Sequence, residues 1–426
     1  MKKLIATFIF FIIIYSHSVS QSLYFPPVND STWDTLSPSS LGWCQNNIDS
    51  LYSYLQSVNT DAFIVLKNGK IVLEKYFGTF TVDSIHYWAS AGKSLTSMMI
   101  GIAQEDGLLN INNPVSNYVG TGWTSETPAE ESQITILNLL TMTSGLNDDP
   151  PAPCDNQDSS SACLQYLTAP GTRWAYHTGA YDHLQSVLGA VTGEPDDIFT
   201  NNFIGAAIGL TGFWYQAVYY STPREMARFG LLALNRGVWN TDTVLYDTSY
   251  FDAMINTSQP YNLSYGYLWW LNGKNSYMGP GLQVVFPGSL IPNAPPDLFA
   301  ALGKNDQKIY VVPSQGLVVV RTGNSAYQVS EAFSPFDNLL WGRIDSLGIN
   351  CQYTFTGNGN WNIATNWINN LIPPQTVQDS SQIFISPQTG GECDLNTPET
   401  LSNGSSLNIS PGAKFKIEGN LTIQKE

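Results

Sequence analysis

The chain is poor in the side chains that usually bind metal ions. It has four histidines, one of them within the first 20 residues, and five cysteines. No two of the cysteines stand in C-x-x-C spacing. Because structural zinc sites need closely spaced thiols and imidazoles, we expect no metal site.

Basic residues are also scarce. The 426 residues include 18 Lys and Arg against 34 Asp and Glu, which gives a formal net charge of −16. A strongly acidic surface repels phosphate groups, which argues against nucleic acid or an anionic membrane as a partner. Solubility outside the cell is a sufficient explanation for this charge.

Long apolar runs are absent beyond the N-terminus, so no later segment is expected to cross a membrane. Lys2 and Lys3 precede an apolar run over residues 4–15, which small and polar residues follow up to Ser20. This pattern predicts a signal peptide over residues 1–20 and therefore a secreted or periplasmic protein. An uncleaved membrane anchor is the alternative, although the apolar run is short for a bilayer.

The five cysteines suggest disulfides, since an exported chain folds in an oxidising compartment. Cys154 and Cys163 close a short loop in a segment rich in Pro, Asp and Ser, and we expect them to pair. Cys351 would pair next with Cys393, or alternatively with Cys44. The odd number leaves one thiol free.

Most of the chain alternates between strand-like and helical patterns. The clearest hairpin has an Asn-Gly turn at Asn68, with apolar strands on both sides. The predicted strands span residues 62–66, 71–76, 309–312 and 317–320, and the predicted helices span 90–106, 223–235 and 337–347. Strands at both ends with helices between them predict an α+β domain over residues 21–350, in which helices flank an antiparallel sheet and a mainly helical region is inserted.

The composition changes after Cys351, where Asn, Gly, Thr, Ser and Pro dominate and short alternating runs appear. We predict a small all-β module over residues 351–426. Glycines at 404, 412 and 419 recur at a spacing that indicates solenoid-like coils. Trp361 and Trp367 could bind carbohydrate at a surface, but core positions are the favoured interpretation.

The sharpest local motif is the S-x-x-K pair of Ser90 and Lys93. Residues three apart share a helix face, so the lysine could hydrogen-bond the serine hydroxyl. A lysine removed from water has a lowered pKa and can accept the serine proton, and a helix N-terminus stabilises an oxyanion. Alone, this short motif occurs frequently by chance.

Three further segments follow this motif along the chain: ITILNLLTMTSGL at residues 134–146, PGTRWAYHTGAY at 170–181 and YGYLWW at 265–270. Together with S-x-x-K, they resemble the serine β-lactamase and penicillin-binding-protein-like family. The branch that looks most similar is that of class C β-lactamases, family VIII-type esterases and oligoamide hydrolases. The resemblance covers residues 41–347 and implies a β-lactamase/transpeptidase-like fold and a cofactor-free serine hydrolase.

The resemblance implies roles for individual residues. Ser90 matches the family nucleophile, Lys93 its lysine, and Tyr176 its catalytic tyrosine. The family's Tyr-x-Asn pattern is Tyr176-His177-Thr178 here, so a hydroxyl at Thr178 replaces a substrate-binding amide. His177 lies beside the predicted site, but neighbouring side chains point in opposite directions, and a surface position is the favoured interpretation.

The family's Lys-Thr-Gly motif is replaced by Lys304-Asn305-Asp306, with Gln307 after it. By this alignment Lys304, Asn305 and Gln307 contribute to substrate binding, and the backbone N–H of Gln307 is the second oxyanion donor beside that of Ser90. Asp306 would repel a substrate carboxylate. Both departures favour small esters or amides without an acidic group over β-lactams.

Three alternatives remain open. A D,D-peptidase or D-aminopeptidase would use the same residues on cell-wall peptides. A catalytically decayed binding protein would keep the fold and lose the reaction, with Thr178 and Asp306 as signs of decay. A Ser-His-Asp hydrolase is disfavoured because the chain contains no G-x-S-x-G motif. In each of these cases the C-terminal module could bind a surface or a carbohydrate.

Overall fold

The computed structural model describes residues 22–327, 333–377 and 380–424. The predicted signal peptide lies outside these residues. Among the described helices, none has both the length and the apolar character that a bilayer crossing requires.

A six-stranded antiparallel sheet forms the centre of the larger domain, with strand order β2-β1-β13-β12-β11-β8. The strands are β1 (Thr60–Lys67), β2 (Lys70–Tyr76), β8 (Trp270–Leu271), β11 (Phe299–Gly303), β12 (Gln307–Val312) and β13 (Leu317–Gly323). The β1-β2 turn has φ of 49° at Asn68 and 84° at Gly69, as a two-residue hairpin requires. The predicted antiparallel sheet is confirmed.

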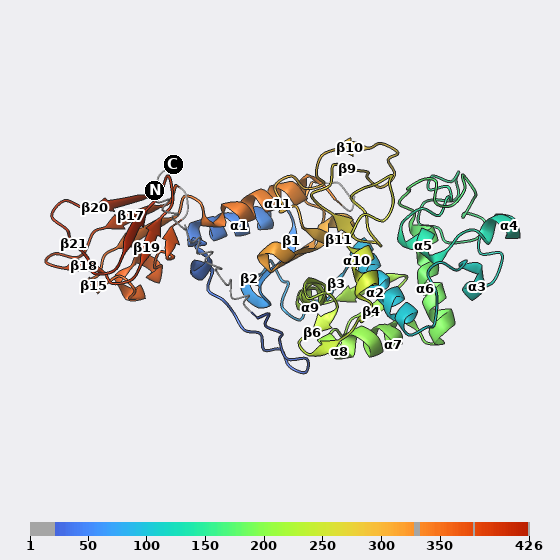
Figure 1. The fold of residues 1–426 in the computed structure, drawn as a ribbon, viewed down its shortest axis with the longest axis horizontal. Coiled ribbons are helices and arrows are strands. Elements are labelled where there is room, and N and C mark those ends of the chain that lie inside the picture. Colours follow the sequence, from blue (N-terminus) through green and yellow to red (C-terminus); the bar gives the residue numbers. More distant parts are fainter. Residues whose placement is uncertain (1–21, 328–332, 378–379, 425–426) are drawn as a thin grey trace, which may run out of the picture.

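Helices cover both faces of this sheet (Figure 1). Side chains alternate along a strand, so β12 sends Lys308 and Tyr310 toward α11 (Pro335–Asp345), where both contact Asp337. Ile309, between them, points to the opposite face and packs at Gly230 of α9 (Pro223–Leu234). Helix α1 (Gln45–Ser57) packs beside α11.

A mainly helical region adjoins the sheet and is reached through α2 (Gly92–Glu105), which is almost wholly buried. At the right of Figure 1 it contains α3 (Ser116–Val119), α4 (Pro128–Glu131), α5 (Ile136–Leu140) and α6 (Thr178–Thr192). Helix α6 packs on α2, where Tyr181 Oη lies 2.7 Å from Thr96 Oγ1, and its apolar side chains Leu184, Val187 and Leu188 are buried. This is the predicted helical insertion.

The last part of the chain winds into three coils, each of which adds one strand to each of three parallel sheets. The coils comprise β14 (Gln352–Phe355), β15 (Gly359–Asn360) and β16 (Thr376–Val377); β17 (Gln382–Ile385), β18 (Glu392–Leu395) and β19 (Glu399–Leu401); and β20 (Ser406–Ile409), β21 (Lys414–Ile417) and β22 (Leu421–Ile423). Trp361 and Trp367 are 1% and 3% exposed, so they form core and are not a carbohydrate-binding surface.

Two disulfides are present. Cys154–Cys163 forms as predicted, and Cys44 pairs with Cys351. Of the two partners predicted for Cys351, Cys44 is confirmed and Cys393 is wrong, because Cys393 on β18 lies in the core of the coils and is a buried free thiol. Cys44 instead lies beside the start of the module, where its backbone N–H donates to Leu347 O at 3.0 Å. Both bonds are compatible with export.

Candidate active site

The turn that carries Ser90 is tightly anchored. It is a short 3₁₀ segment, Ala89–Ala91, which leads directly into α2. Before it, Trp88 donates its backbone N–H to Tyr219 O and its indole N–H to Ser221 Oγ, both at 2.8 Å. Ala89 has φ of 50°, a conformation that costs a non-glycine residue free energy and that the surrounding contacts must hold.

Strand β11 ends against this turn, at Gly303. A Cβ atom on Gly303 would lie 2.4 Å from Trp88 O and 3.1 Å from Ala91 N, so no other residue fits without displacing the Ser90 turn. The next residue, Lys304, lines the same cavity as Ser90. The end of β11 therefore forms the wall opposite the helical region.

Lys93 follows Ser90 by one turn and is 5% exposed. Its Nζ lies 4.0 Å from the ring centroid of Tyr181 and 5.6 Å from that of Tyr176. Burial lowers the pKa of Lys93 to about 8, while the carboxylate of Asp182 acts in the opposite direction and Lys304 adds to the decrease. A substantial fraction of this amine is thus neutral near physiological pH, as a proton acceptor needs to be.

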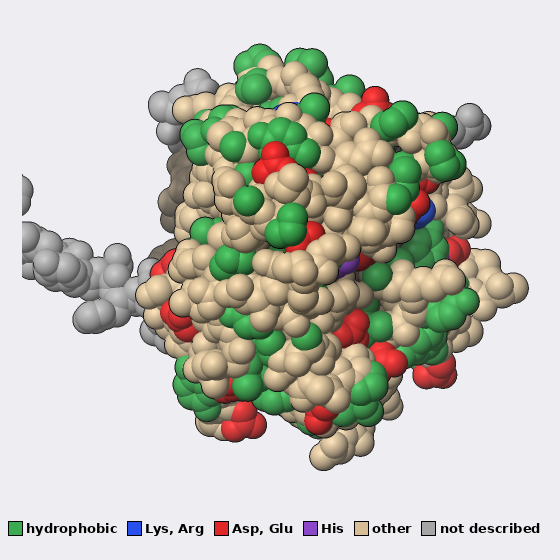
Figure 2. Space-filling view, turned by 90° about the vertical axis from the view of Figure 1, so that its right-hand side faces the viewer, with side chains coloured by type: hydrophobic (Ala, Val, Ile, Leu, Met, Phe, Trp, Pro, Cys, Tyr) green, Lys and Arg blue, Asp and Glu red, His purple; other side chains and the backbone are tan. Residues whose placement is uncertain are grey.

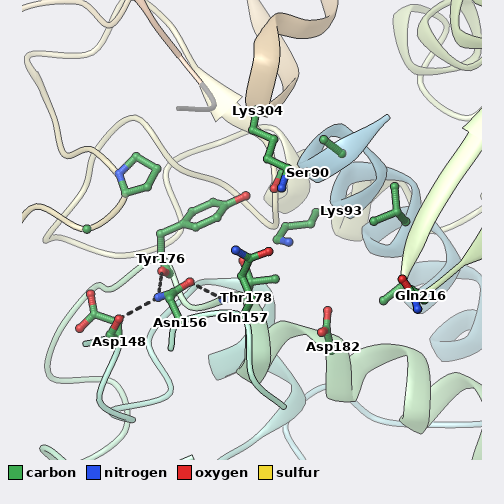
Figure 3. Close-up of a pocket in the computed structure, with 15 residues that line it drawn as sticks. Ser90, Lys93, Asp148, Asn156, Gln157, Tyr176, Thr178, Asp182, Gln216 and Lys304 are labelled. Atoms are coloured by element: carbon green, nitrogen blue, oxygen red, sulfur yellow. Dashed lines mark hydrogen bonds between the residues drawn. The ribbon is translucent and has the colours of Figure 1, made fainter. Parts of the chain in front are cut away.

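Tyr176 reaches toward Ser90 from the segment that precedes α6 (Figure 3). The side chain of Asn156 fixes that segment through three backbone groups. Its amide donates to Tyr176 O at 2.9 Å and to Asp148 O at 3.0 Å, and its carbonyl accepts from Thr178 N at 3.1 Å. Asn156 therefore sets the position of both Tyr176 and Thr178.

Asn156 belongs to the loop closed by the Cys154–Cys163 disulfide, which docks on the start of α6. The backbone carbonyl of Asn156 accepts a hydrogen bond from Gly179 N at 2.8 Å. A Cβ on Gly179 would lie 2.2 Å from Asp158 O, so a glycine is needed for this close approach. The disulfide loop is thereby one wall of the site.

These walls enclose a cavity of about 440 Å³. Among its lining residues are Ser90, Lys93, Asp148, Asn156, Gln157, Tyr176, Thr178, Asp182, Gln216, Pro280, Gly281 and Lys304. Figure 3 shows Lys304 and Ser90 on one side, Tyr176 and Thr178 facing them, and Asp182 farther along α6. Ser90, Lys93, Tyr176, Thr178 and Lys304 are thus brought together.

Two of the proposed substrate-binding residues lie elsewhere. Asn305 donates its side-chain amide to Tyr87 Oη at 2.8 Å, and its backbone is left-handed, with φ of 58°. Gln307 is fully buried, and its amide donates to Asn305 O at 3.0 Å and to Gly323 O at 2.6 Å. Neither lines the cavity. Their hydrogen bonds instead hold the turn between β11 and β12 in place.

Two charged or titratable residues, Asp306 and His177, also lie in positions that differ from those predicted. Asp306 is buried, 3.2 Å from Lys308 Nζ, and accepts from Ser334 Oγ at 2.8 Å, so it does not repel a ligand in the cavity. His177 is 1% exposed rather than on the surface, and its Nδ1 accepts from Ala180 N as the N-cap of α6. Burial lowers the pKa of His177 to about 4, which keeps it neutral.

Sequence reasoning missed Asn156, Asp182 and Gln216. Asp182 had a signal, because it follows Thr178 by four residues and therefore shares its helix face. Asn156 and Gln216 lie in irregular segments, where spacing along the chain does not predict which side chains meet.

A family model described as Beta-lactamase matches residues 49–339. This match covers more than half of the chain, and the chain belongs to the β-lactamase family. The putative penicillin-binding protein PbpX of Bacillus subtilis (strain 168) is 28% identical over 187 residues, which are 40% of this chain and 45% of that protein. The chain is thus matched to less than half of that relative's length.

Solved structures agree on the fold. A putative 6-aminohexanoate-dimer hydrolase from Bacillus anthracis has a TM-score of 0.56 at 20% identity, covering 74% of this chain and 87% of that one. A putative beta-lactamase from Bacteroides dorei DSM 17855 has a TM-score of 0.57 at 18% identity, covering 72% and 99%. Proteins of this β-lactamase-type fold include hydrolases of esters and amides.

Proposed function

We propose that the protein is an exported serine hydrolase of small esters or amides that works through an acyl-enzyme on Ser90. The observation that carries this proposal is the buried amine of Lys93, which shares one cavity with Ser90 and Tyr176. A serine hydroxyl needs a nearby base at neutral pH, and an amine whose pKa is about 8 can serve as one.

In the first step, Ser90 Oγ bonds to the substrate carbonyl carbon, and its proton passes to neutral Lys93, directly or through the hydroxyl of Tyr176. The carbonyl oxygen becomes an oxyanion, for which the backbone N–H groups of Ser90 and Lys304 are the proposed donors. Lys304 takes this role in place of Gln307 because Gly303 brings its end of β11 against the Ser90 turn.

The tetrahedral intermediate then collapses. The bond to the leaving group breaks, the proton held by Lys93 and Tyr176 moves to the departing oxygen or nitrogen, and the acyl group stays on Ser90. Water next attacks the ester, with the same two residues accepting its proton and returning one to Ser90 Oγ. No metal or organic cofactor takes part in this proposed sequence.

The preference for substrates without an acidic group rests on Thr178 and on the strand motif. Thr178 replaces the amide of the family pattern, and Asn305, at the position of the motif's hydroxyl, is bonded to Tyr87 rather than facing the cavity. Lys304 alone offers a flexible, exposed ammonium for a substrate carboxylate. Asp306 no longer contributes to this preference.

A fluorophosphonate probe and a set of substrates test the proposal. The probe should label the wild-type protein and fail to label Ser90→Ala. Short-chain p-nitrophenyl esters should be turned over, whereas nitrocefin and D-Ala-D-Ala peptides should not. Rapid nitrocefin hydrolysis would refute the substrate class, peptide cleavage would favour the D,D-peptidase alternative, and absence of labelling would favour a binding protein that has lost the reaction.

A further inference from the structure

One face of α6 leads away from the proposed nucleophile. Thr178, Asp182 and Ser186 are spaced by four residues and therefore lie in a row along the helix. Thr178 and Asp182 line the cavity that contains Ser90, and Asp182 and Ser186 line an adjoining hollow of about 520 Å³. Asp182 thus stands where the two spaces join.

The carboxylate of Asp182 has no hydrogen-bond or ion-pair partner among the residues that the structure describes. The other carboxylate of the cavity, Asp148, is different, because it binds Arg173 at 2.5 Å. Burial raises the pKa of Asp182 to about 6, and the nearby amine of Lys93 opposes the increase. The group is therefore mostly ionised at neutral pH, in a position where a charge normally needs a counter-ion.

The hollow beside Asp182 suits a cation. It is lined by Ser159, Asp182, Gln185, Ser186, Asp196, Gln216 and Ala217, and none of these residues carries a positive charge. The positive charges near Asp182 belong to the cavity of Ser90: Lys93, whose amine acts on the carboxylate, and Lys304, which stands farther away, on the side of Ser90 (Figure 3). A cationic group would therefore approach Asp182 from the side of the hollow.

The charge of the whole protein acts in the same direction. Its formal net charge is −16. Figure 2 shows carboxylates scattered over the face of the helical region, with only small areas of Lys and Arg. An acidic surface of this kind attracts cationic molecules and raises their local concentration.

We propose that Asp182 is a specificity-determining residue that binds a positively charged group of the substrate, so that the enzyme acts on esters or amides that carry an ammonium group. This inference rests on the proposed function of Ser90. The scissile carbonyl lies at Ser90, and the ammonium group extends along α6 toward Asp182 and Gln185.

Matched substrate pairs that differ only in charge test the inference. One pair carries the charge on the acyl side: the p-nitrophenyl esters of 4-(trimethylammonio)butanoate and of its neutral isostere 5,5-dimethylhexanoate. The other carries it on the leaving group: acetylthiocholine and S-(3,3-dimethylbutyl) thioacetate. In at least one pair, the kcat/KM of the wild-type protein should be at least about tenfold higher for the cationic substrate than for its neutral isostere.

Asp182→Asn should bring that ratio close to one. The variant should still hydrolyse the neutral esters, and slightly faster than the wild type at about pH 7. Removing the carboxylate lowers the pKa of Lys93 further, so that more of its amine is neutral. A merely structural role for Asp182 would reduce both rates together. Asp83→Asn removes the same charge from an exposed turn outside the cavity and should keep the wild-type ratio.

The outcomes separate this inference from the proposed function. If the neutral esters are hydrolysed and Ser90 is labelled, but neither pair shows a preference for the cation, Asp182 does not select the substrate. The same conclusion follows if Asp182→Asn keeps the wild-type ratio. If no ester is hydrolysed and the fluorophosphonate does not label Ser90, the proposed function fails, and this inference fails with it.

Discussion

Replacing Asn156 with alanine tests whether the disulfide loop positions the proposed catalytic tyrosine. The asparagine makes three hydrogen bonds to backbone groups, at 2.9, 3.0 and 3.1 Å. Each is worth about 1 kcal/mol net, so Asn156→Ala should lose roughly 2–3 kcal/mol. Part of this loss lowers stability, and part allows the Tyr176–Thr178 segment to shift.

Two measurements divide these effects. Thermal unfolding should occur at a midpoint lower by about 3 °C, because a loss of roughly 2 kcal/mol is divided by an unfolding entropy of about 0.65 kcal/mol/K for a domain of roughly 300 residues. Well below that temperature, kcat for a p-nitrophenyl ester should fall by about 10–100-fold, because small displacements of a catalytic group are costly. KM should change less, since Tyr176 acts mainly on the reacting atoms.

A matched control is Gln165→Ala, which removes a side-chain amide that makes one hydrogen bond, to Ala162 O at 3.1 Å, near the same loop. It should leave kcat close to that of the wild type. The reasoning would be refuted if Asn156→Ala unfolds at a lower temperature but hydrolyses the ester at the wild-type rate. Tyr176 would then be held without Asn156.

Three further predictions concern the same site. Because burial lowers the pKa of Lys93 to about 8, the rate at which a fluorophosphonate labels Ser90 should rise with pH through about 8 and then level off; a rate independent of pH between about 6 and 9 would exclude Lys93 as the base. Gly303→Ala should reduce kcat/KM at least about tenfold while the protein remains folded by circular dichroism, since its Cβ would lie 2.4 Å from Trp88 O; unchanged kinetics would show that the Ser90 turn tolerates displacement. Replacing Cys154 and Cys163 together by serine should destabilise the protein by about 2–3 kcal/mol in denaturant unfolding and lower kcat, whereas an unchanged kcat would show that the loop keeps its place without the bond.

The sequence predicts those parts of the fold that follow from local patterns. The Asn68-Gly69 hairpin and the helix predicted over residues 223–235 depend on only a few neighbouring residues, and both are present in the structure, the helix as α9. The buried strands of the sheet are apolar and short, which also makes them recognisable. Pairing partners are harder to predict, because the choice between Cys44 and Cys393 depends on how the first helix packs near Leu347.

The residues of the candidate site show the same difference between local motifs and contacts that depend on distant segments. Ser90, Lys93 and Tyr176 belong to motifs with a distinctive order along the chain. Asn305 and Gln307 were misplaced by the length of the β11-β12 turn, since a shift of a few residues moves a different side chain to the cavity wall. Asn156 contributes through contacts between distant loops, which no local pattern reports.

The Cys44–Cys351 disulfide has a consequence for how the two parts of the molecule transmit force. Cys351 begins the coiled module, and Cys44 immediately precedes α1, whose packing partners include β1 and α11. The module is therefore joined to the larger domain by two covalent connections, one through the backbone at residue 350 and one through the disulfide. A pull on the coils would therefore reach the larger domain through both α11 and α1 rather than through the backbone connection alone.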